Sequence, residues 1–388
     1  MEWDTLICDK RVATDKFKEP QEWKDHPIDE FEKDYKNIIS NSAFRRLQDK
    51  TQVFPLDKSD FVRTRLTHSI EVSTIANQLW HMIYNGIKEG KTVAITAAVH
   101  GGEYTGVFGL IKLSREISPQ DLSGQLILVH ITNVSAFEAK MQYVGPIDGK
   151  NLNRCFPGDK NGTHTEQLAY FISEEVYGQS DFFLDLHSGD IHEDLMPFTL
   201  YHRDASEEVR MESRKIGELM NLGPVIGSGS DCGSINGMAM KYNIPGVLAE
   251  LGCRGECNVD QAILYKDRIL NVLYYYGLLD GEAEVLNPEE VDYVHCMYCL
   301  DADIGGLWYP SYGAGDEVSE GELVGYITDY FGNILREYHS PVNGRILYNT
   351  TSLAIRNGDP LISFISNINT CTCCSNHGLL EWHNRDNI

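Results

Sequence analysis

The segment TVAITAAVHGGEYTG, residues 92–106, decides the fold of this chain and points to its chemistry. It begins as an apolar, β-branched run that predicts a buried strand, and His100 follows where that strand should end. Glu103 comes three residues later, and Gly101 and Gly102 allow the chain to turn sharply between the two. Because α/β folds usually place their sites at the carboxyl edge of the sheet, both side chains are expected to enter one pocket there.

A second apolar run, DFFLDLHSGD at residues 181–190, ends in the same way at His187. A lone histidine at a strand end is usually a satisfied polar residue, and a lone HxxE pair is weak evidence for a metal. Together the two runs supply His, Glu and His and leave a fourth position for water, which is the pattern of a catalytic zinc site. The sequence therefore predicts one Zn²⁺ per chain, held by His100, Glu103 and His187.

Strand-like and helical stretches alternate through residues 83–287. The runs QLILVHITNV, PFTLYH and IPGVLAELG predict strands, and residues 164–177 and 206–221 have helical periodicity. Alternation of this kind predicts an α/β domain with a largely buried sheet.

A different texture begins near residue 288. Through residues 288–366, the turn sequences GAGD, FGN, VNG and NGD recur and no long helical period is present, which predicts a small all-β module. Residues 367–388 have neither period, and we expect this cysteine-containing tail to be loosely ordered.

Composition limits the class of protein. The 388 residues include 33 Lys and Arg against 57 Asp and Glu, a formal net charge of −24, and 42% of them are hydrophobic. This length predicts two or three domains, and the acidic balance argues against nucleic-acid binding because it repels phosphate backbones. With no apolar run long enough to span a bilayer and no secretory signal, we expect no membrane association and a cytoplasmic location.

The 10 cysteines are too dilute for a disulfide scaffold. Cys296 and Cys299 could in principle form a zinc site with His377 and the cysteines of the tail. Their spacing matches no standard zinc knuckle, however, so we expect buried or incidental thiols.

Four motifs, HGGEYTG, KNLNRCFPG, DLHSGD and IPGVLAELG, follow one another in this order. They resemble the zinc deacylases of the succinylglutamate desuccinylase/aspartoacylase family, relatives of the zinc carboxypeptidases, and the resemblance covers about residues 90–365. It implies a zinc-carboxypeptidase-like (M14-like) α/β/α domain with a mainly β-sheet core. It also implies a C-terminal β module similar to the barrel-sandwich fold of lipoyl and biotinyl carriers.

The same resemblance implies roles for individual residues. Beside the three metal ligands, it makes Glu250 the general base, and it makes Asn153 and Arg154 the residues that bind a carboxylate of the substrate. These roles are chemically reasonable. Zinc lowers the pKa of bound water, a carboxylate can pass the proton of that water to the departing amine, and a guanidinium binds a carboxylate bidentately.

The chain departs from the family pattern at two points. Where relatives often have an arginine upstream of NLNR, this chain offers Lys140, which is either a substrate-binding residue or a solvated surface lysine. A carrier domain would need a lysine at its hairpin tip, and residues 301–365 contain none, so the module is expected to be a structural or gating accessory. Asp185 either orients His187 or belongs to the edge of the core.

The N-terminal part resembles a different family. Residues 28–79, most clearly AFRRLQDKTQVFPL, are similar to the beginning of HD-type dGTP triphosphohydrolases, and helical spacing of apolar residues predicts a helical segment within residues 1–82. The resemblance makes His68 a first metal ligand, but the chain contains no His-Asp dipeptide to complete that site. The segment is either a natural fusion or the result of joining two reading frames.

These features predict a zinc-dependent hydrolase that removes an acyl group from an N-acyl amino acid or related small amine. We expect it to bind a small substrate that carries a carboxylate, and to bind neither nucleic acid nor membranes. A homo-oligomer is compatible with the sequence. Three alternatives stand beside this interpretation: a carboxypeptidase acting on peptide ends, a nucleotide triphosphohydrolase, and a binding protein without turnover.

Overall fold

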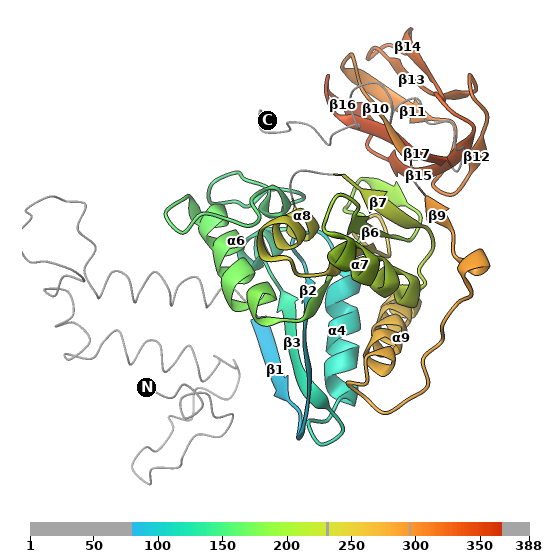
Figure 1. Ribbon diagram of the computed structural model, residues 1–388. Coiled ribbons are helices and arrows are strands. Elements are labelled where there is room, and N and C mark those ends of the chain that lie inside the picture. The colour runs from blue at the N-terminus through green and yellow to red at the C-terminus, as the bar shows by residue number, and fades with distance from the viewer. Residues whose placement is uncertain (1–79, 230–232, 295, 367–388) are drawn as a thin grey trace, which may run out of the picture. The chain divides into compact units, whose positions relative to one another are not determined.

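The computed structural model describes residues 80–229, 233–294 and 296–366 (Figure 1). The helical segment predicted before residue 80 and the loose tail predicted after residue 366 lie outside the described residues. Within them, helices flank an eight-stranded sheet, and two smaller sheets form an all-β C-terminal module. The predicted α/β domain and β module are therefore confirmed.

The large sheet has the strand order β1-β3-β2-β4-β8-β6-β7-β9. Its strands are β1 (Trp80–Asn85), β2 (Lys88–Ala97), β3 (Ser123–Ile131), β4 (Phe182–His187), β6 (Phe198–His202), β7 (Val225–Ser228), β8 (Gly246–Glu250) and β9 (Tyr293–Val294). Strands β3, β2, β4 and β8 run parallel to one another, whereas β1 is antiparallel to β3 and β6 is antiparallel to β8. All of β4 is buried, as expected of a parallel strand covered on both faces.

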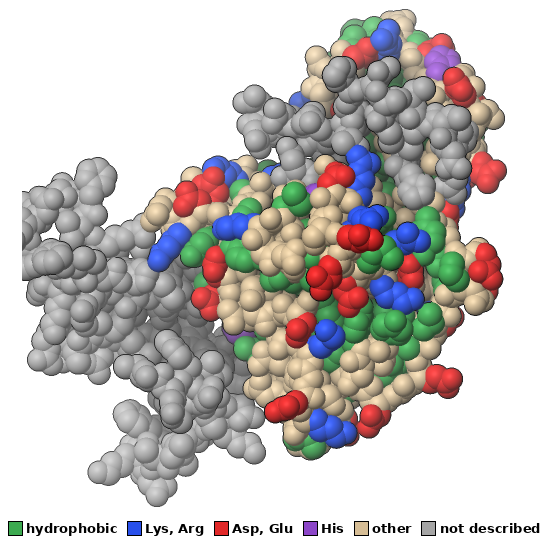
Figure 2. Space-filling view, viewed as in Figure 1, with side chains coloured by type: hydrophobic (Ala, Val, Ile, Leu, Met, Phe, Trp, Pro, Cys, Tyr) green, Lys and Arg blue, Asp and Glu red, His purple; other side chains and the backbone are tan. Residues whose placement is uncertain are grey.

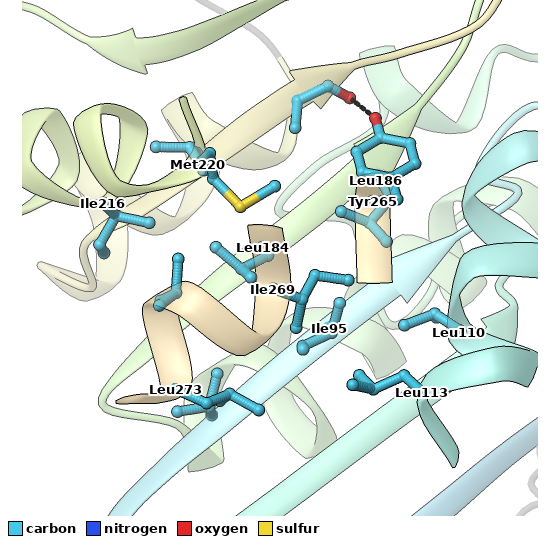
Figure 3. Close-up of a cluster of buried hydrophobic side chains, with 14 of the residues drawn as sticks. Ile95, Leu110, Leu113, Leu184, Leu186, Ile216, Met220, Tyr265, Ile269 and Leu273 are labelled. Carbon is cyan, nitrogen blue, oxygen red and sulfur yellow. Dashed lines mark hydrogen bonds between the residues drawn. The ribbon is translucent and has the colours of Figure 1, made fainter. Parts of the chain in front are cut away.

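Helices cover both faces of this sheet. They are α4 (Thr105–Glu116), α5 (Val134–Ala139), α6 (His164–Glu175), α7 (Glu207–Met220), α8 (Ser234–Gly237) and α9 (Val259–Tyr275), with the short turns η4 (Leu152–Arg154), η5 (Tyr177–Gln179), η6 (Met238–Tyr242) and η7 (Pro288–Glu290). Helices α4, α7 and α9 pack on one face, where Figure 3 shows their apolar side chains against Ile95, Leu184 and Leu186. Helix α6 packs on the other face with Ala94 and Phe183. The alternation of neighbouring strand residues between two cores produces three layers.

Local signals explain the two helices that the sequence predicts. Helix α6 begins with a capping box, in which the Glu166 carboxylate accepts a hydrogen bond from the Thr163 backbone N–H. Ser206 caps the start of helix α7 with its hydroxyl, which accepts from the Val209 backbone N–H, and Asn221 caps its end in the left-handed conformation. Both helices lie where the periodicity of residues 164–177 and 206–221 predicts them.

The C-terminal module consists of two sheets with a shared apolar core. Its strands are β10 (Cys296–Asp301), β11 (Gly306–Pro310), β12 (Glu317–Val318), β13 (Leu323–Thr328), β14 (Ile334–His339), β15 (Gly344–Thr350), β16 (Ala354–Ile355) and β17 (Pro360–Ser366). One sheet has the order β10-β17-β15-β12, and the other has the order β14-β13-β11-β16. Trp308 fills the core between them and donates its indole N–H to the Thr350 carbonyl at 3.1 Å.

Three strands differ from the boundaries expected from the sequence. Residues 80–82, expected in the helical segment, begin β1, because the backbone of Met82 pairs with Leu128 of β3. Strand β9 lies beyond residue 287 yet extends the large sheet beside β7. Strand β5 (Glu193–Leu195) lies inside the α/β region but pairs with β15 of the C-terminal module. Backbone pairing between segments distant in sequence decides all three, and no local pattern reports it.

The surface carries charges of both signs. On the face shown in Figure 2, Asp and Glu side chains lie beside Lys and Arg side chains and do not gather into a large patch of one sign. Within the described ranges, no helix has both the length and the apolar content needed to cross a membrane.

The central core should be sensitive to truncation at Leu184. This side chain is fully buried in the core under α4, α7 and α9. We expect Leu184→Ala to lower the free energy of unfolding by about 2–5 kcal/mol, because it removes apolar contacts and leaves a cavity. The same change at Leu353, whose side chain is 51% exposed, should have an effect of less than about 1 kcal/mol in denaturant titrations. Equal effects at both positions would contradict this packing.

Candidate metal centre

The loop after β2 carries two of the predicted ligands. Directly after this strand, Ala98 adopts a left-handed conformation, with φ at 53°. At Gly102, a Cβ atom would come within 1.9 Å of Asp190 Oδ1, so the close approach of the loop requires glycine. The turn brings His100 Nδ1 to 2.6 Å from Glu103 Oε1.

Parallel strand pairing brings the third ligand to the same edge of the sheet. Strands β2 and β4 are in register, with Ala97 opposite Leu186, and His187 is the last residue of β4. On the other side of β4, Glu250 at the end of β8 lies opposite His187. Three strands of one sheet therefore end together, and each end contributes a polar side chain, as the sequence predicts.

The three predicted ligands form one buried cluster. The ligand atoms of His100, Glu103 and His187 lie within 4.8 Å of one another. His187 Nδ1 is 2.9 Å from Glu103 Oε2 in an ion-pair contact, and Oε2 accepts no geometrically defined hydrogen bond from the described residues. A buried carboxylate oxygen without a donor, beside two imidazole nitrogens, is an environment suited to a cation. Two histidines and one glutamate are also a common donor set of catalytic zinc.

The outer nitrogen of each imidazole faces a side-chain oxygen. His187 Nε2 lies 3.3 Å from Asp185 Oδ2, and His100 Nε2 lies 3.0 Å from Asn151 Oδ1. Such partners hold a metal-binding imidazole in one tautomer and one orientation, here with Nδ1 toward the cluster. Asn151 is missing from the sequence prediction, although it is the first asparagine of the NLNR motif. Its Oδ1 also accepts from the Asn153 backbone N–H at 2.9 Å, which ties the motif to the histidine.

The charges of the cluster reinforce one another. Burial alone would raise the pKa of Glu103, but His187 and His100 lower this pKa to about 2. Burial alone would lower the pKa of His187, but Glu103 and Asp185 raise it well above its usual value. The site thus favours a positive charge between buried carboxylates, which a divalent metal also supplies.

Glu250 has the environment of a strong base. One of its carboxylate oxygens, Oε2, is buried without a hydrogen-bond partner among the described residues. Burial, aided by Glu103, Glu193 and Asp185, raises the pKa of Glu250 well above its usual value, and His187 opposes this shift. A buried carboxyl group with a raised pKa, beside a cluster of metal-ligand side chains, is a frequent feature of catalytic sites.

The three predicted substrate-binding residues divide into two groups. Asn153 and Arg154 lie in the turn η4, which Asn151 fastens to His100. Asn153 is buried, and the half-buried Arg154 donates from Nη1 to the Asn153 carbonyl at 3.3 Å. Lys140 instead is an exposed residue that ends α5 in the left-handed conformation, and its ammonium group forms no hydrogen bond or ion pair with described residues.

An acidic group that sequence reasoning misses lies on the other side of His100. Tyr143 stacks edge-on against the His100 ring and donates its hydroxyl to Glu193 Oε1 at 2.7 Å. Glu193 Oε2 accepts the backbone N–H of Asp190 at 2.8 Å. Asp190, the last residue of the DLHSGD motif, is fully buried, and burial raises its pKa to about 7. The chain thus surrounds the cluster with more buried carboxylates than the motifs alone indicate.

Comparison with known proteins identifies relatives of the α/β region. The profile of the succinylglutamate desuccinylase/aspartoacylase catalytic domain matches residues 89–276. The chain is 30% identical over 247 residues to the N-alpha-acetyl-L-2,4-diaminobutyric acid deacetylase of Halomonas elongata. That match covers 62% of this chain and 71% of the deacetylase.

Solved structures give the same relationship. The ectoine utilization protein EutE (DoeB) of Ruegeria pomeroyi, determined with product bound, superposes with a TM-score of 0.67 at 26% identity, over 74% of this chain and 88% of that chain. A succinylglutamate desuccinylase/aspartoacylase of Rhodobacter sphaeroides superposes with a TM-score of 0.66 at 26% identity, over 74% of this chain and 89% of that chain.

A second likeness is strong but short. The chain is 50% identical over 91 residues to a deoxyguanosinetriphosphate triphosphohydrolase-like protein of Listeria innocua. This match covers 24% of the chain and 19% of the relative, so the chain spans about a fifth of that protein's length. It agrees with the resemblance that residues 28–79 carry in the sequence.

The metal centre can be tested by removing one ligand. We expect the purified protein to bind about one zinc ion per chain, and His187→Ala to lose most of it, because two remaining ligands hold zinc weakly. His192→Ala is the matched control, since this exposed histidine lies five residues further along the chain and outside the cluster. Elemental analysis that finds full zinc occupancy in His187→Ala would refute the assignment.

Asp190 should make the stability of the metal-free protein depend on pH. Its pKa rises from a usual 3.8 to about 7 on folding, so the folded state keeps a proton that the unfolded state has already released. This contribution is fully present below about pH 4 and is lost as the pH rises through about 7. Asp190→Asn removes that dependence.

The melting temperature of Asp190→Asn minus that of the unsubstituted protein should therefore increase from pH 4 to pH 8. Asp280→Asn, at an exposed aspartate, serves as the control and should show no such trend. Parallel pH curves for the Asp190→Asn variant and the unsubstituted protein would show that Asp190 is ionised in the folded state.

Proposed function

The chain belongs to the succinylglutamate desuccinylase/aspartoacylase family, and on that premise we propose that it is a zinc-dependent hydrolase of N-acyl amino acids. Members of this family remove acyl groups, so the chain is an acyl-removing hydrolase. The observation that carries the finer proposal is the convergence of His100, Glu103 and His187 beside Glu250 at one sheet edge.

His100, Glu103 and His187 would hold the zinc ion through two imidazole Nδ1 atoms and a carboxylate. A bound zinc ion supplies an acidified water molecule and polarises the acyl carbonyl group. Asn151 would hold the Nε2 atom of His100, and Asp185, 3.3 Å from the Nε2 atom of His187, would attract the N–H there, so that the two Nδ1 atoms stay available.

Glu250 moves the proton in this proposal. Its position opposite His187 puts the carboxylate next to the ligands without making it one of them. Because burial raises its pKa, Glu250 Oε2 is a better proton acceptor than a solvated carboxylate. It would accept the proton of the attacking water and then donate it to the departing nitrogen.

Asn153 and Arg154 would bind a carboxylate of the substrate. The Asn153 Oδ1 atom already accepts the Ser234 backbone N–H at 3.1 Å, so the amide N–H₂ is the part left to contact a substrate oxygen. The Arg154 guanidinium adds a planar pair of donors that matches a carboxylate. Lys140 remains a weaker candidate for this role, because its side chain is exposed.

The relative from Halomonas elongata guides the choice of acyl group. By its name, that protein removes an acetyl group from N-α-acetyl-2,4-diaminobutyric acid. Acetylated amino acids, including acetylated diamino acids, are therefore the first substrates to test. No triphosphohydrolase activity is proposed, because the corresponding likeness covers 19% of that relative.

The test measures amine release from N-acetyl amino acids by the zinc-loaded protein. Glu250→Gln keeps the size of the side chain and removes the base, so kcat should fall by at least about 100-fold while zinc content stays the same. Glu256→Gln, at an exposed acid nearby in the chain, is the control and should keep normal turnover. The primary amides of the same compounds, which lack the carboxylate, should be poor substrates.

Two results would overturn the proposal. A Glu250→Gln variant with near-normal turnover, or one that has lost its zinc, would mean that the role of Glu250 is wrong. Release of C-terminal amino acids from peptides, without any hydrolysis of N-acyl amino acids, would instead identify a carboxypeptidase.

A further inference from the structure

Ser234 makes two contacts that join separate parts of the site. It is fully buried at the first position of α8, 47 residues after His187 in the sequence. Its hydroxyl donates to Asp185 Oδ2 at 2.5 Å, and its backbone N–H donates to Asn153 Oδ1 at 3.1 Å. One residue thus contacts both the partner of a metal ligand and a residue of the proposed carboxylate site.

The first contact fixes the orientation of Asp185. This carboxylate is fully buried, and Oδ2 faces both Ser234 Oγ and His187 Nε2. Its other oxygen, Oδ1, accepts the hydroxyl of Thr96 at 2.8 Å, and Thr96 Oγ1 in turn lies 2.7 Å from the Tyr177 hydroxyl. Because the single hydroxyl proton of Thr96 goes to Asp185, Tyr177 donates to Thr96. Hydroxyl donors therefore hold Asp185 from both sides.

The second contact fixes the orientation of Asn153. With Oδ1 bound to the Ser234 N–H, the amide cannot rotate by half a turn without breaking this bond, so its N–H₂ keeps one direction. The approach depends on Gly233, which has φ at 93° and whose Cβ position would lie 3.1 Å from Asn153 Oδ1. Glycine at this position lets the start of α8 come close to the turn η4.

We propose that Ser234 is a positioning residue. Its hydroxyl sets the orientation of His187 through Asp185, and its backbone N–H sets the orientation of Asn153. This inference rests on the proposed function, since it assigns the two ends of the link to the metal and to the substrate carboxylate. In this arrangement the distance between the metal ligand and the carboxylate-binding amide is fixed by a rigid element. The site would therefore select substrates by the spacing between the acyl group and the carboxylate.

Ser234→Ala removes the hydroxyl and is the direct test. Loss of the group that orients Asp185 should weaken zinc binding by about 10- to 100-fold, measured by competition with a chromophoric chelator. At saturating zinc, the KM for an N-acetyl amino acid should also rise, by roughly two- to tenfold, because the start of α8 is no longer fixed against Asp185. Ser234→Thr, which keeps the hydroxyl, should restore zinc affinity.

Thr96→Val is the matched control. It removes the other hydroxyl that binds Asp185 and leaves the contact to Asn153 untouched. It should weaken zinc binding as Ser234→Ala does, yet leave KM unchanged at saturating zinc. Gly233→Ala provides the converse, because it crowds Asn153 Oδ1 and keeps the Ser234 hydroxyl, and should raise KM more than it weakens zinc binding.

The outcomes separate this inference from the proposed function. Zinc affinity and KM of Ser234→Ala equal to those of the unsubstituted protein would overturn it. Equal effects of Ser234→Ala and Thr96→Val on KM would overturn the link to Asn153. If Ser234→Ala loses its native circular dichroism spectrum, the other two variants decide. Thr96→Val should weaken zinc binding at unchanged KM, and Gly233→Ala should raise KM more than it weakens zinc binding. If the unsubstituted protein hydrolyses no N-acyl amino acid, the proposed function fails, while chelator competition still tests the link between Ser234 and the metal.

Discussion

The parallel register of β2, β4 and β8 is the constraint on which the rest of the structure depends. Because Ala97 lies opposite Leu186 and His187 opposite Glu250, the three strands end at one edge. A shift of one residue in β4 would turn His187 to the opposite face, away from Glu103. The two apolar cores above and below the sheet hold that register, so packing far from the site sets the position of every candidate ligand.

Buried acidity is the second determinant of this centre. Glu103, Asp185 and Asp190 are buried in or beside it, and the half-buried Glu250 has one buried oxygen. Buried carboxylates are unfavourable unless they are paired, hydrogen-bonded or protonated. Two hydroxyl donors, from Thr96 and Ser234, satisfy Asp185, whereas one oxygen each of Glu103 and Glu250 lacks a donor among the described residues. This excess of carboxylates is compatible with the divalent cation and the mobile proton of the proposed function.

Sequence patterns identify the parts of the site that follow strand ends. His100 and His187 each close an apolar run, so the fold class and the clustering of these histidines with Glu103 could be predicted together. Asn151 and Ser234 could not, because their partners lie tens of residues away and depend on how loops pack on the sheet. Lys140 is the opposite case. Its place upstream of NLNR suggests substrate binding, but its exposed side chain does not support that role.

Strand β5 has a consequence for any attempt to divide this protein. Glu193 and Leu195 lie just after the Asp190 loop but pair with Thr350 and Tyr348 of β15. A protein shortened near residue 288 would lose that partner strand and leave an unpaired strand edge beside the candidate metal centre, open to pairing with other chains. Exchange of C-terminal modules between relatives would likewise have to carry a compatible β5. The linear order of the chain suggests a domain boundary near residue 288. Because β5 crosses that boundary to pair with β15, a cut there would not separate two independent domains.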